Sequence, residues 1–585
     1  MLVRRAIFLL VAASLTLGNL FPLFRGLSTQ QAMDQAQIGR EVARGNGLST
    51  KFIRPVELAM AEAAAGGGSV AMTKFHDTMH APLYPLVLGA VFKVVDVDAE
   101  RYQMDPAGSF IFPLDRVVAG VSTVFFLLSI LMSHRLACRI FDAKIAGVTA
   151  ILMLFSGLFW DFATSGLPQM AMLFLFSCGM YFAYLAVEAT REERSAVVPA
   201  IAAGLFFSLM SLTHWLALWI LLGYLIYAAV VFRPRGVISI GIVALVLGLI
   251  AWPVVSSIQH TGSPFGSAGL VLQEALGNHP PDKIMRAASK EAYQLDLKGI
   301  VMRIGRTVLV QVTDLLPFLG GILAAPLFFL TLLHTFKRPA IASFRWMVLV
   351  MWVMATVGMA IYGVAAKDLH PNQVHLLFAP IMTAYGLAFL AVLWSRLELP
   401  ERGPVFANGH LIVVVLISAL PLLLALPDRI RDGMNRAGRG IPQWPPYVPP
   451  VLNVNLHDWV AEEQIVVSDQ PWAVAWYADR VSVWLPLKRE AFERLEERAG
   501  SLGTPLAGVL ITPSSYGSAD LDKIPDVFED FTSLVLDGPM VGATLPQPTA
   551  LFEVDPKLEG FRQRYPYRIP LLGQQIIYYA KQPPR

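Results

Sequence analysis

Long apolar segments separated by short polar ones dominate the first 427 residues of the chain. Most are close to the roughly 20 residues that a helix needs to cross the hydrocarbon core of a bilayer. The pattern therefore predicts an α-helical polytopic membrane protein with about eleven membrane-spanning helices. We expect these at residues 6–24, 113–133, 145–162, 167–187, 196–212, 215–232, 237–257, 314–334, 346–365, 374–394 and 409–427.

The first apolar segment follows Arg4 and Arg5 and ends without the small-residue pattern of a signal-peptide cleavage site. It is also long for the apolar core of a signal peptide. We therefore predict an uncleaved first span, and a cleavable signal peptide is the alternative.

Residues 81–95 are apolar but too short for an easy span, and the charges of the later loops decide their placement. If this segment crossed the membrane, the basic residues of the later short loops would face outward, against the positive-inside rule. These basic residues are Arg135, Arg139, Lys144, Arg233, Arg235, Lys337, Arg338 and Arg345. We therefore predict a helix that lies along the membrane surface. The N-terminus is then cytoplasmic, and loops 25–112 and 258–313 and the C-terminal segment lie outside an inner (plasma) membrane.

The C-terminal part has a different pattern. A Pro-rich stretch indicates a stiff linker at 428–450, between a membrane domain at 1–427 and a domain at 451–585. Short β-like segments follow, with a helical pattern at Lys488–Ala499. The predicted strands are Ile465–Ser468, Val481–Leu485, Gly508–Thr512, Ser533–Leu536 and Gln575–Ala580. This pattern predicts an extracytoplasmic α/β domain.

Composition agrees with a membrane protein, since 55% of the residues are hydrophobic, 15% are charged and the mean hydropathy is +0.55. A net charge of +3 gives no reason to expect a nucleic-acid partner. Cys138 and Cys178 lie in or beside apolar segments, where they are most simply packing residues.

The first external loop concentrates polar chemistry near the membrane. Ser28 or Thr29 can cap a short amphipathic helix that Gly45-Asn46-Gly47 ends, and Asp34 and Ile38 share one face of it. The same helix carries Arg40 and Arg44. The loop then runs into His80-Ala81-Pro82-Leu83-Tyr84-Pro85. A carboxylate, two arginines and a Pro-Leu-Tyr-Pro turn at the bilayer surface indicate a site.

The stretch from Asp34 to Gly47 and the turn at Ala81-Pro82-Leu83-Tyr84 resemble the first external loop of the GT-C glycosyltransferases. The likeness extends to the protein mannosyltransferase, lipid A aminoarabinose transferase and galacturonosyltransferase group. The resemblance implies an inverting glycosyltransferase that takes a sugar from a polyprenyl-phosphate carrier. Its partners would be that lipid-linked donor, membrane lipid and an envelope acceptor (a lipid, a polysaccharide or a protein).

Two acids are candidates for catalysis under this resemblance. Asp34 would deprotonate or orient the acceptor hydroxyl, and the alternative is that it only stabilises the start of its helix. Asp161 is placed at the outer end of a span, where an acid is costly. Its alternative is an interfacial position within an aromatic belt. Many relatives carry a further carboxylate where this chain has Gln169.

Other polar residues are candidates for substrate binding. His76, Asp77 and His80 could hold a metal, contact a sugar or lie in solvent, because their spacing matches no specific zinc signature. A divalent metal is possible but not required by the sequence. Arg40, Arg44 and Tyr84 come from the first loop.

Two further stretches match family landmarks less well. His260 follows Trp252-Pro253, a reversed form of a family motif that leads into the second external loop. Basic residues of that loop could also meet a phosphate. The second stretch, Asp368–Pro380, lacks the arginine that contacts the carrier phosphate in many relatives. Lys367, His370 or His375 would have to serve instead.

A non-enzymatic transporter or lipid-handling membrane protein is the competing hypothesis. Such a protein would be expected to show internal symmetry and polar or Gly/Pro breaks in the middle of its spans. Here the polar residues gather at the outer ends of the predicted helices instead, which favours the transferase.

Overall fold

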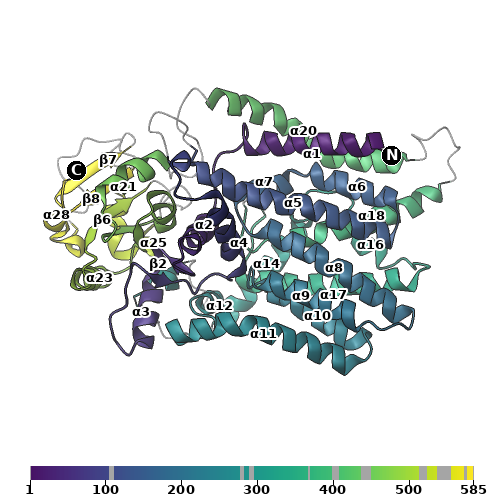
Figure 1. Cartoon of the computed structure of the whole chain (residues 1–585), viewed down its shortest axis with the longest axis horizontal. Helices are drawn as coiled ribbons and strands as arrows, with labels where there is room; N and C mark the ends of the chain where they lie inside the picture. The colour runs from purple at the N-terminus through teal and green to yellow at the C-terminus, as the bar shows by residue number, and fades with distance from the viewer. Residues whose placement is uncertain are drawn as a thin grey trace. The chain divides into compact units, whose positions relative to one another are not determined.

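A computed structural model of the protein divides into two compact units. A helical unit consists of Met1–Leu27, Arg116–Trp252 and Val301–Gly438, and a mixed unit consists of Ser28–Asp115, Pro253–Ile300 and Arg439–Arg585. Figure 1 labels the elements of both. The structure describes residues 2–103, 111–276, 282–288, 296–366, 369–397, 408–436, 449–512, 524–536, 555–571 and 576–583.

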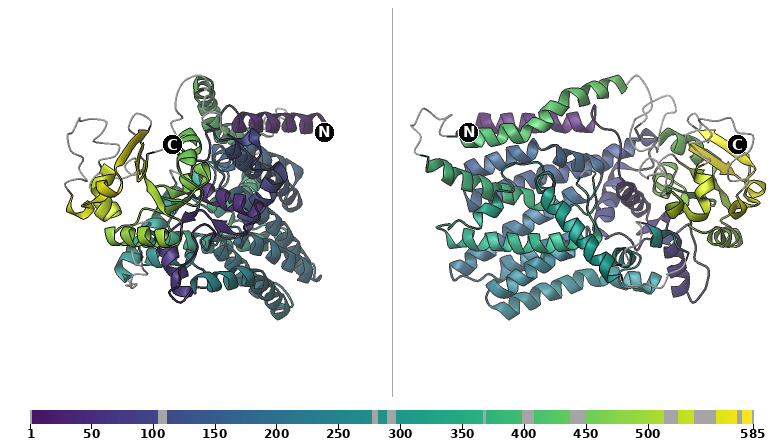
Figure 2. Two further views of the ribbon diagram at one scale, coloured as in Figure 1. Left: turned by 60° about the vertical axis from the view of Figure 1, so that its left-hand side comes forward. Right: turned by 180° about the vertical axis from the view of Figure 1, so that it is seen from behind.

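The helical unit is built from apolar helices that lie side by side in Figure 1 and in the view from behind in Figure 2. Helix α8 packs along α9, α10 along α17, and α18 against both α6 and α8. The main helices of this part of the chain are α1 (Leu2–Leu20), α5 (Pro113–Ile140), α6 (Ala143–Leu154), α7 (Gly157–Ser165), α8 (Gln169–Arg191), α9 (Val197–Ser211), α10 (Ala217–Val231), α11 (Arg235–Thr261), α14 (Leu297–Thr313), α17 (Pro339–Tyr362), α18 (His375–Ser395) and α20 (Gly409–Arg436).

Within the described residues, six helices are long and apolar enough to cross a membrane, namely α5, α8, α11, α17, α18 and α20. A seventh span results if α6 and α7, which meet at an angle of 59°, count as one. A polytopic α-helical membrane protein is therefore confirmed. The total of eleven spans stays a prediction, since α1, α9 and α10 are shorter apolar helices.

Two predicted boundaries in the helical unit are wrong. Residues 314–334 form no continuous helix, only α15 (Leu315–Phe318) and α16 (Phe328–Thr331) joined by turns. Gly320 and Gly321 adopt φ of 78° and 66°, a left-handed conformation that ends a helix. Pro317 and Pro326 also remove backbone donors from this stretch. Conversely, α20 continues past Pro427 to Arg436, into the first part of the predicted linker.

A six-stranded sheet forms the core of the mixed unit, in the order β2-β5-β4-β6-β8-β7. The first four strands of that order are parallel, and β8 pairs antiparallel with β6 and with β7. The strands are β2 (Phe52–Ile53), β4 (Ile465–Ser468), β5 (Val481–Trp484), β6 (Leu506–Ile511), β7 (Tyr567–Leu571) and β8 (Ile576–Ala580). The sheet and α23 (Arg489–Ser501) confirm the predicted α/β region.

Strand β2 comes from the first external loop, and it joins the C-terminal sheet by pairing Phe52 with Ser482 and Ile53 with Val483. The loop also contributes Ile53, Leu58, Met72 and Phe75 to the apolar core of this sheet. The loop and the C-terminal segment therefore fold as one unit. The domain boundary at residue 451 stays a prediction.

In the C-terminal segment one predicted strand is wrong and one strand was missed, and the short strands of the first loop were not predicted either. Residues Ser533–Leu536 belong to helix α26 (Thr532–Leu536), which follows the short helix α25 (Ile524–Phe528) and buries Leu534 and Val535. Periodicity cannot separate a strand from a helix in an apolar run of four residues. Strand β7 escaped notice because its side chains are mostly exposed or half-buried, and Pro570 interrupts it.

The first loop itself folds into α2 (Gln30–Ala43), β1 (Ser49–Thr50), β2, α3 (Pro55–Ala64), β3 (Phe75–His76) and α4 (Leu83–Val95). Helices α2 and α4 cross at two glycines. A Cβ on Gly39 would lie 2.8 Å from the Cβ of Leu88, and one on Gly89 would lie 2.5 Å from Val42 Cγ1. Any larger residue would therefore push the helices apart. The helix predicted at 81–95 is present, and its position on a membrane surface stays a prediction.

Candidate active site

The helix that carries Asp34 begins and ends as the sequence predicts. The Thr29 hydroxyl accepts a hydrogen bond from the backbone N–H of Ala32 at 3.3 Å, as an N-cap does. At the other end, Gly45 and Gly47 adopt left-handed φ values of 85° and 69°. Between these ends, Asp34 is fully buried within the mixed unit.

Three side chains hold the Asp34 carboxylate. Arg54 donates from Nη2 to Oδ2 at 2.6 Å, and Gln37 donates from Nε2 to Oδ1 at 3.0 Å. The Nε2 atom of His80 lies 3.5 Å from the same Oδ2. The buried charge is therefore matched by one guanidinium and one imidazole.

Arg54 serves a second carboxyl group. Its Nη1 lies 3.3 Å from Oε1 of Glu57, which is also fully buried. The Ser267 hydroxyl donates a short hydrogen bond to the same oxygen of Glu57. Burial raises the pKa of Glu57 above its usual value, and Arg54 only partly opposes this shift.

His80 lies between two aspartates. Its Nδ1 is 3.2 Å from Oδ1 of Asp77, and its backbone N–H donates to Oδ2 of Asp77 at 3.0 Å. Burial disfavours the charged imidazole, but Asp34 and Asp77 outweigh burial and raise the pKa of His80. Burial likewise opposes the charge of Asp77, but His80 and Arg54 lower its pKa overall.

We call Asp34, Arg54, Glu57, Asp77 and His80 the Asp34 cluster. In this buried group three carboxyl groups share one guanidinium and one imidazole. Cations within contact distance favour the ionised form of a carboxyl group in a dry site. An ionised carboxylate is what a general base or an orienting acceptor of hydrogen bonds requires.

The residues of the H-D-x-x-H candidate make separate contacts. Asp77 and His80 contact each other, whereas His76 stacks on His260, with ring centroids 4.0 Å apart and an interplanar angle of 15°. Its Nε2 also lies 3.0 Å from the Ser256 hydroxyl. Within the described residues, no group of three or more His, Cys, Asp or Glu side chains could hold a metal ion.

The two arginines of α2 point to a different acid, Asp479. Arg40 and Arg44 each place Nη2 2.9 Å from an oxygen of this carboxylate, and Lys51 places Nζ at 2.5 Å. Arg40 also donates to the carbonyl oxygens of Ala475 and Trp476 at 2.6 and 2.9 Å. Both arginines therefore tie α2 to the C-terminal segment, and a substrate-binding role for them stays a prediction.

Tyr84 lies in the first turn of α4 and is buried. The remaining candidates belong to the helical unit, except Lys367, which lies outside the described residues. Asp161 lies on α7 and forms an ion pair with Arg429 at 3.3 Å. His375 is fully buried at the start of α18 and bonds Gln311 at 2.8 Å.

Residues of the 369–376 stretch contact one another and α8. His370 Nδ1 accepts from the backbone N–H of Asn372 at 3.1 Å. Gln169 donates from Nε2 to the Pro371 carbonyl at 2.5 Å. Gln169 thus links the start of α8 to this stretch.

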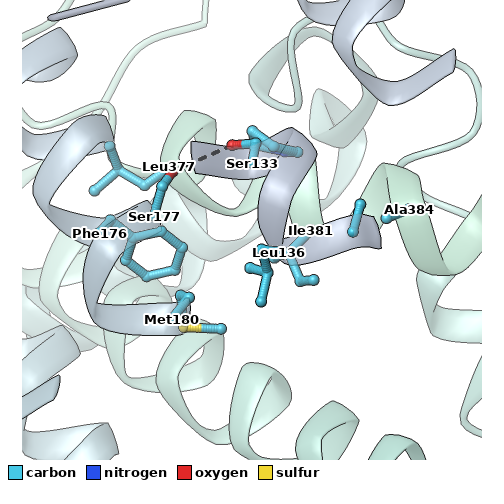
Figure 3. A pocket seen from close by; sticks show the side chains of 10 residues that line it. Ser133, Leu136, Phe176, Ser177, Met180, Leu377, Ile381 and Ala384 are labelled. Atoms are coloured by element: carbon cyan, nitrogen blue, oxygen red, sulfur yellow. Dashed lines mark hydrogen bonds between the residues drawn. The ribbon is translucent and has the colours of Figure 1, made fainter. Parts of the chain in front are cut away.

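Figure 3 shows a small cavity in the helical unit, where Ser133 of α5 and Ser177 of α8 point toward each other and their hydroxyls lie 3.2 Å apart. Its volume is about 10 Å³. That is room for about one water molecule, so this cavity is no substrate site.

Sequence analysis missed Arg54, Glu57 and Asp479. A signal for the first two was present. Pro55 occupies the first helical position of α3 and Glu57 the third, a pattern that marks the start of a helix. Asp479 had no local signal, because it meets Arg40 and Arg44 across more than 400 residues of sequence.

No known family model matches the chain, and no curated protein matches its sequence. Its structure is similar to that of the archaeal oligosaccharyltransferase AglB from Archaeoglobus fulgidus, solved in complex with an inhibitory peptide and a dolichol-phosphate. The two are 12% identical, the match covers 86% of this chain and 69% of AglB, and the TM-score is 0.50. The chain has a GT-C-like fold. The resemblance drawn from the sequence motifs is thereby confirmed at the level of the fold.

A second solved structure is that of ArnT from Cupriavidus metallidurans bound to undecaprenyl phosphate. It is 14% identical to this chain, the match covers 89% of this chain and 94% of ArnT, and the TM-score is 0.49.

Proposed function

We propose that the protein is a glycosyltransferase that moves a sugar from a polyprenyl-phosphate carrier to an envelope acceptor on the outer face of the membrane. The fold it shares with an oligosaccharyltransferase solved with dolichol-phosphate supports this proposal. The acceptor is a lipid, a polysaccharide or a protein, and the reaction inverts the configuration of the transferred sugar.

The observation that carries the proposal is the burial of Asp34 against the side chains of Arg54 and His80. A carboxylate is expensive to bury, and a role as a helix cap would not require it, because Thr29 already caps α2. Asp34 acts on the acceptor hydroxyl, which takes the place of the Gln37 amide at Oδ1. Arg54 and His80 hold the opposite oxygen and keep the carboxylate in place.

The carrier phosphate requires a cation or hydrogen-bond donors. Arg40 and Arg44 already compensate Asp479, so we assign the phosphate contact to Lys367, His370 or His375, as the family resemblance implies. His76, His260 and Tyr84 are assigned to the acceptor or sugar side.

The experiment is a transfer assay with purified protein, radiolabelled polyprenyl-phosphate sugars and an envelope extract. A positioned general base typically contributes about 10²–10⁴-fold to the rate. Asp34→Asn keeps the size of the side chain and removes its charge, so transfer should fall by that factor while carrier binding falls much less. Asp98→Asn is the matched control, since Asp98 is an exposed acid that pairs with Arg44.

An Asp34→Asn protein with near wild-type turnover would show that this acid has no catalytic part. A wild-type protein that moves the carrier across a vesicle membrane without forming a glycosylated product would favour the transporter hypothesis instead.

The proposed orientation places the N-terminus in the cytoplasm and the mixed unit outside. It is tested with single cysteines at Ala65 and Ser195 in a background where Cys138 and Cys178 are replaced by serine. Both positions are exposed. An impermeant reagent should label Ala65→Cys in intact cells and Ser195→Cys only after permeabilisation. Labelling of Ser195→Cys from outside would overturn this orientation.

A further inference from the structure

A groove of about 520 Å³ runs along the helical unit where α10 ends and α17 begins. Its walls are almost entirely apolar. Residues 339–350 of α17 span roughly 18 Å, about one leaflet of the hydrocarbon core. The apolar lining consists of Ile226, Val230, Val231, Pro339, Ala342, Trp346 and Val350.

Polar side chains line the same groove. Arg191, the last residue of α8, donates from Nη2 to the Ser343 hydroxyl at 2.9 Å. The hydroxyl of Tyr227 lies 2.7 Å from the same Ser343 oxygen and donates to its carbonyl at 3.1 Å. This network fixes the guanidinium at the groove, and the single hydrogen bond leaves it donor capacity for a ligand.

Arg191 differs from two neighbouring arginines in its contacts with acids. Two neighbouring arginines have their own acids, since Arg139 pairs with Glu188 at 2.8 Å and Arg194 pairs with Glu192. Among the described residues, no carboxylate pairs with Arg191. An apolar groove that ends at a guanidinium is complementary to an amphiphile with a negative headgroup.

We propose that this groove binds an anionic phospholipid, with an acyl chain along α10 and α17 and the phosphate on Arg191. Trp346 is 47% exposed and lines the groove, and its amphipathic ring suits the level of the lipid headgroups. The basic residues of the later short loops, among them Arg233 and Arg338, add to the attraction for anionic lipid. None of the residues assigned to the proposed reaction lines the groove, so the lipid site is proposed independently of that reaction.

The test is native mass spectrometry of the full chain, delipidated and then incubated with phosphatidylglycerol and phosphatidylethanolamine of identical acyl chains. We expect the wild type to retain the anionic lipid about fivefold better, from the attraction of one surface arginine. Arg191→Gln should abolish this preference. Arg194→Gln removes a charge from the same connecting region but lines no part of the groove, and it should keep the preference.

A second variant keeps the test decisive if Arg191→Gln folds poorly. Ala342→Trp fills the groove from its wall and should lower the retention of both lipids while leaving the charges in place. Equal retention of the two lipids by the wild type, or an equal loss in Arg194→Gln, would overturn the proposal. Displacement of phosphatidylglycerol by an equimolar amount of undecaprenyl phosphate would also overturn it, because the groove would then belong to the carrier.

Discussion

Both acids that the sequence presents as catalytic candidates pair with an arginine, and the two pairs differ in kind. Asp34 Oδ2 lies 2.6 Å from Arg54 Nη2, and the side chains of Asp34 and Arg54 are 1% and 3% exposed. Asp161 Oδ1 lies 3.3 Å from Arg429 Nη1, and the side chains of Asp161 and Arg429 are 40% and 41% exposed. The first pair is surrounded by further charged groups. The second is one contact between two accessible side chains.

The difference separates two acids that the sequence presents as similar candidates. Burying a pair of charges costs several kcal/mol per ion, which is offset only by good geometry and further hydrogen bonds. An exposed pair costs and contributes little. Burying Asp34 therefore costs free energy that the rest of the fold must offset, whereas the exposed position of Asp161 costs little. We take Asp34 as the centre of the site for this reason.

The largest expected effect comes from removing the cation of the buried pair. Arg54→Gln leaves Asp34 and Glu57 without their shared guanidinium, and breaking a buried pair typically costs about 3–5 kcal/mol. The thermal unfolding midpoint of the purified protein should fall accordingly. Arg429→Gln is the matched control and should change stability by less than about 1 kcal/mol. Equal shifts in the two variants would contradict the distinction drawn between the pairs.

Sequence analysis found the parts of this site whose signals are local. The Thr29 cap, the glycines after α2 and the Pro-Leu-Tyr turn depend on neighbouring residues, so the position of Asp34 on a short helix could be predicted. Four of the five predicted strands were found for the same reason, because β4, β5, β6 and β8 are buried on both faces and form continuous apolar runs. The helix-breaking effect of Gly320 and Gly321 was available in the sequence, but the apolar composition of 314–334 concealed it.

The rest depends on contacts between distant residues. Nothing near Arg54 shows that it meets Asp34 twenty residues earlier, and nothing near Phe52 shows that it pairs with Ser482. Burial cannot be deduced from the residue type of a charged side chain, because such residues are usually exposed. The grouping of the buried side chains in the Asp34 cluster could therefore be seen only in the structure.

A smaller loss is expected at Asp479, which holds the other arginines of α2. Asp479→Asn removes the acid that Arg40, Arg44 and Lys51 share, although Arg44 keeps its contacts with Glu41 and Asp98. We expect a loss of about 2–3 kcal/mol, less than for Arg54 because the Asp479 side chain is 19% exposed and water can reach the cations. If Arg40 is structural, Arg40→Gln should destabilise the protein without raising the KM for the carrier. A raised KM at unchanged stability would restore Arg40 to substrate binding.

Two histidines four residues apart should give opposite pH dependence. The pKa of His80 is raised by Asp34 and Asp77 against the effect of burial, so its stabilising contribution is complete below the unfolded pKa of about 6.5 and is lost as pH rises through its folded pKa. The pKa of His76 is lowered by burial and by His260, so its neutral form is favoured and stability declines as pH falls below about 6.5.

The measurement is the unfolding midpoint of the wild type, His80→Gln and His76→Gln between pH 5.5 and 8.5. His80→Gln should be less stable than the wild type by about 1–2 kcal/mol at the acidic end, with the difference shrinking toward the alkaline end. His76→Gln should show the reverse trend. Parallel curves for both variants would mean that neither histidine changes its charge in this range.

The smallest effect is expected at Asp161, the acid of the exposed pair. Asp161→Asn removes one partner of an accessible pair, so stability should change by less than about 1 kcal/mol. Transfer should fall by less than in Asp34→Asn, because an accessible side chain held by a single contact is poorly placed to move a proton. If the two acids act independently, the double variant should show the product of the two fold losses. Equal losses that do not multiply would mean that both acids serve one step, for example through a shared metal ion. The exposure of Asp161 and its single contact would then say nothing about its role in catalysis.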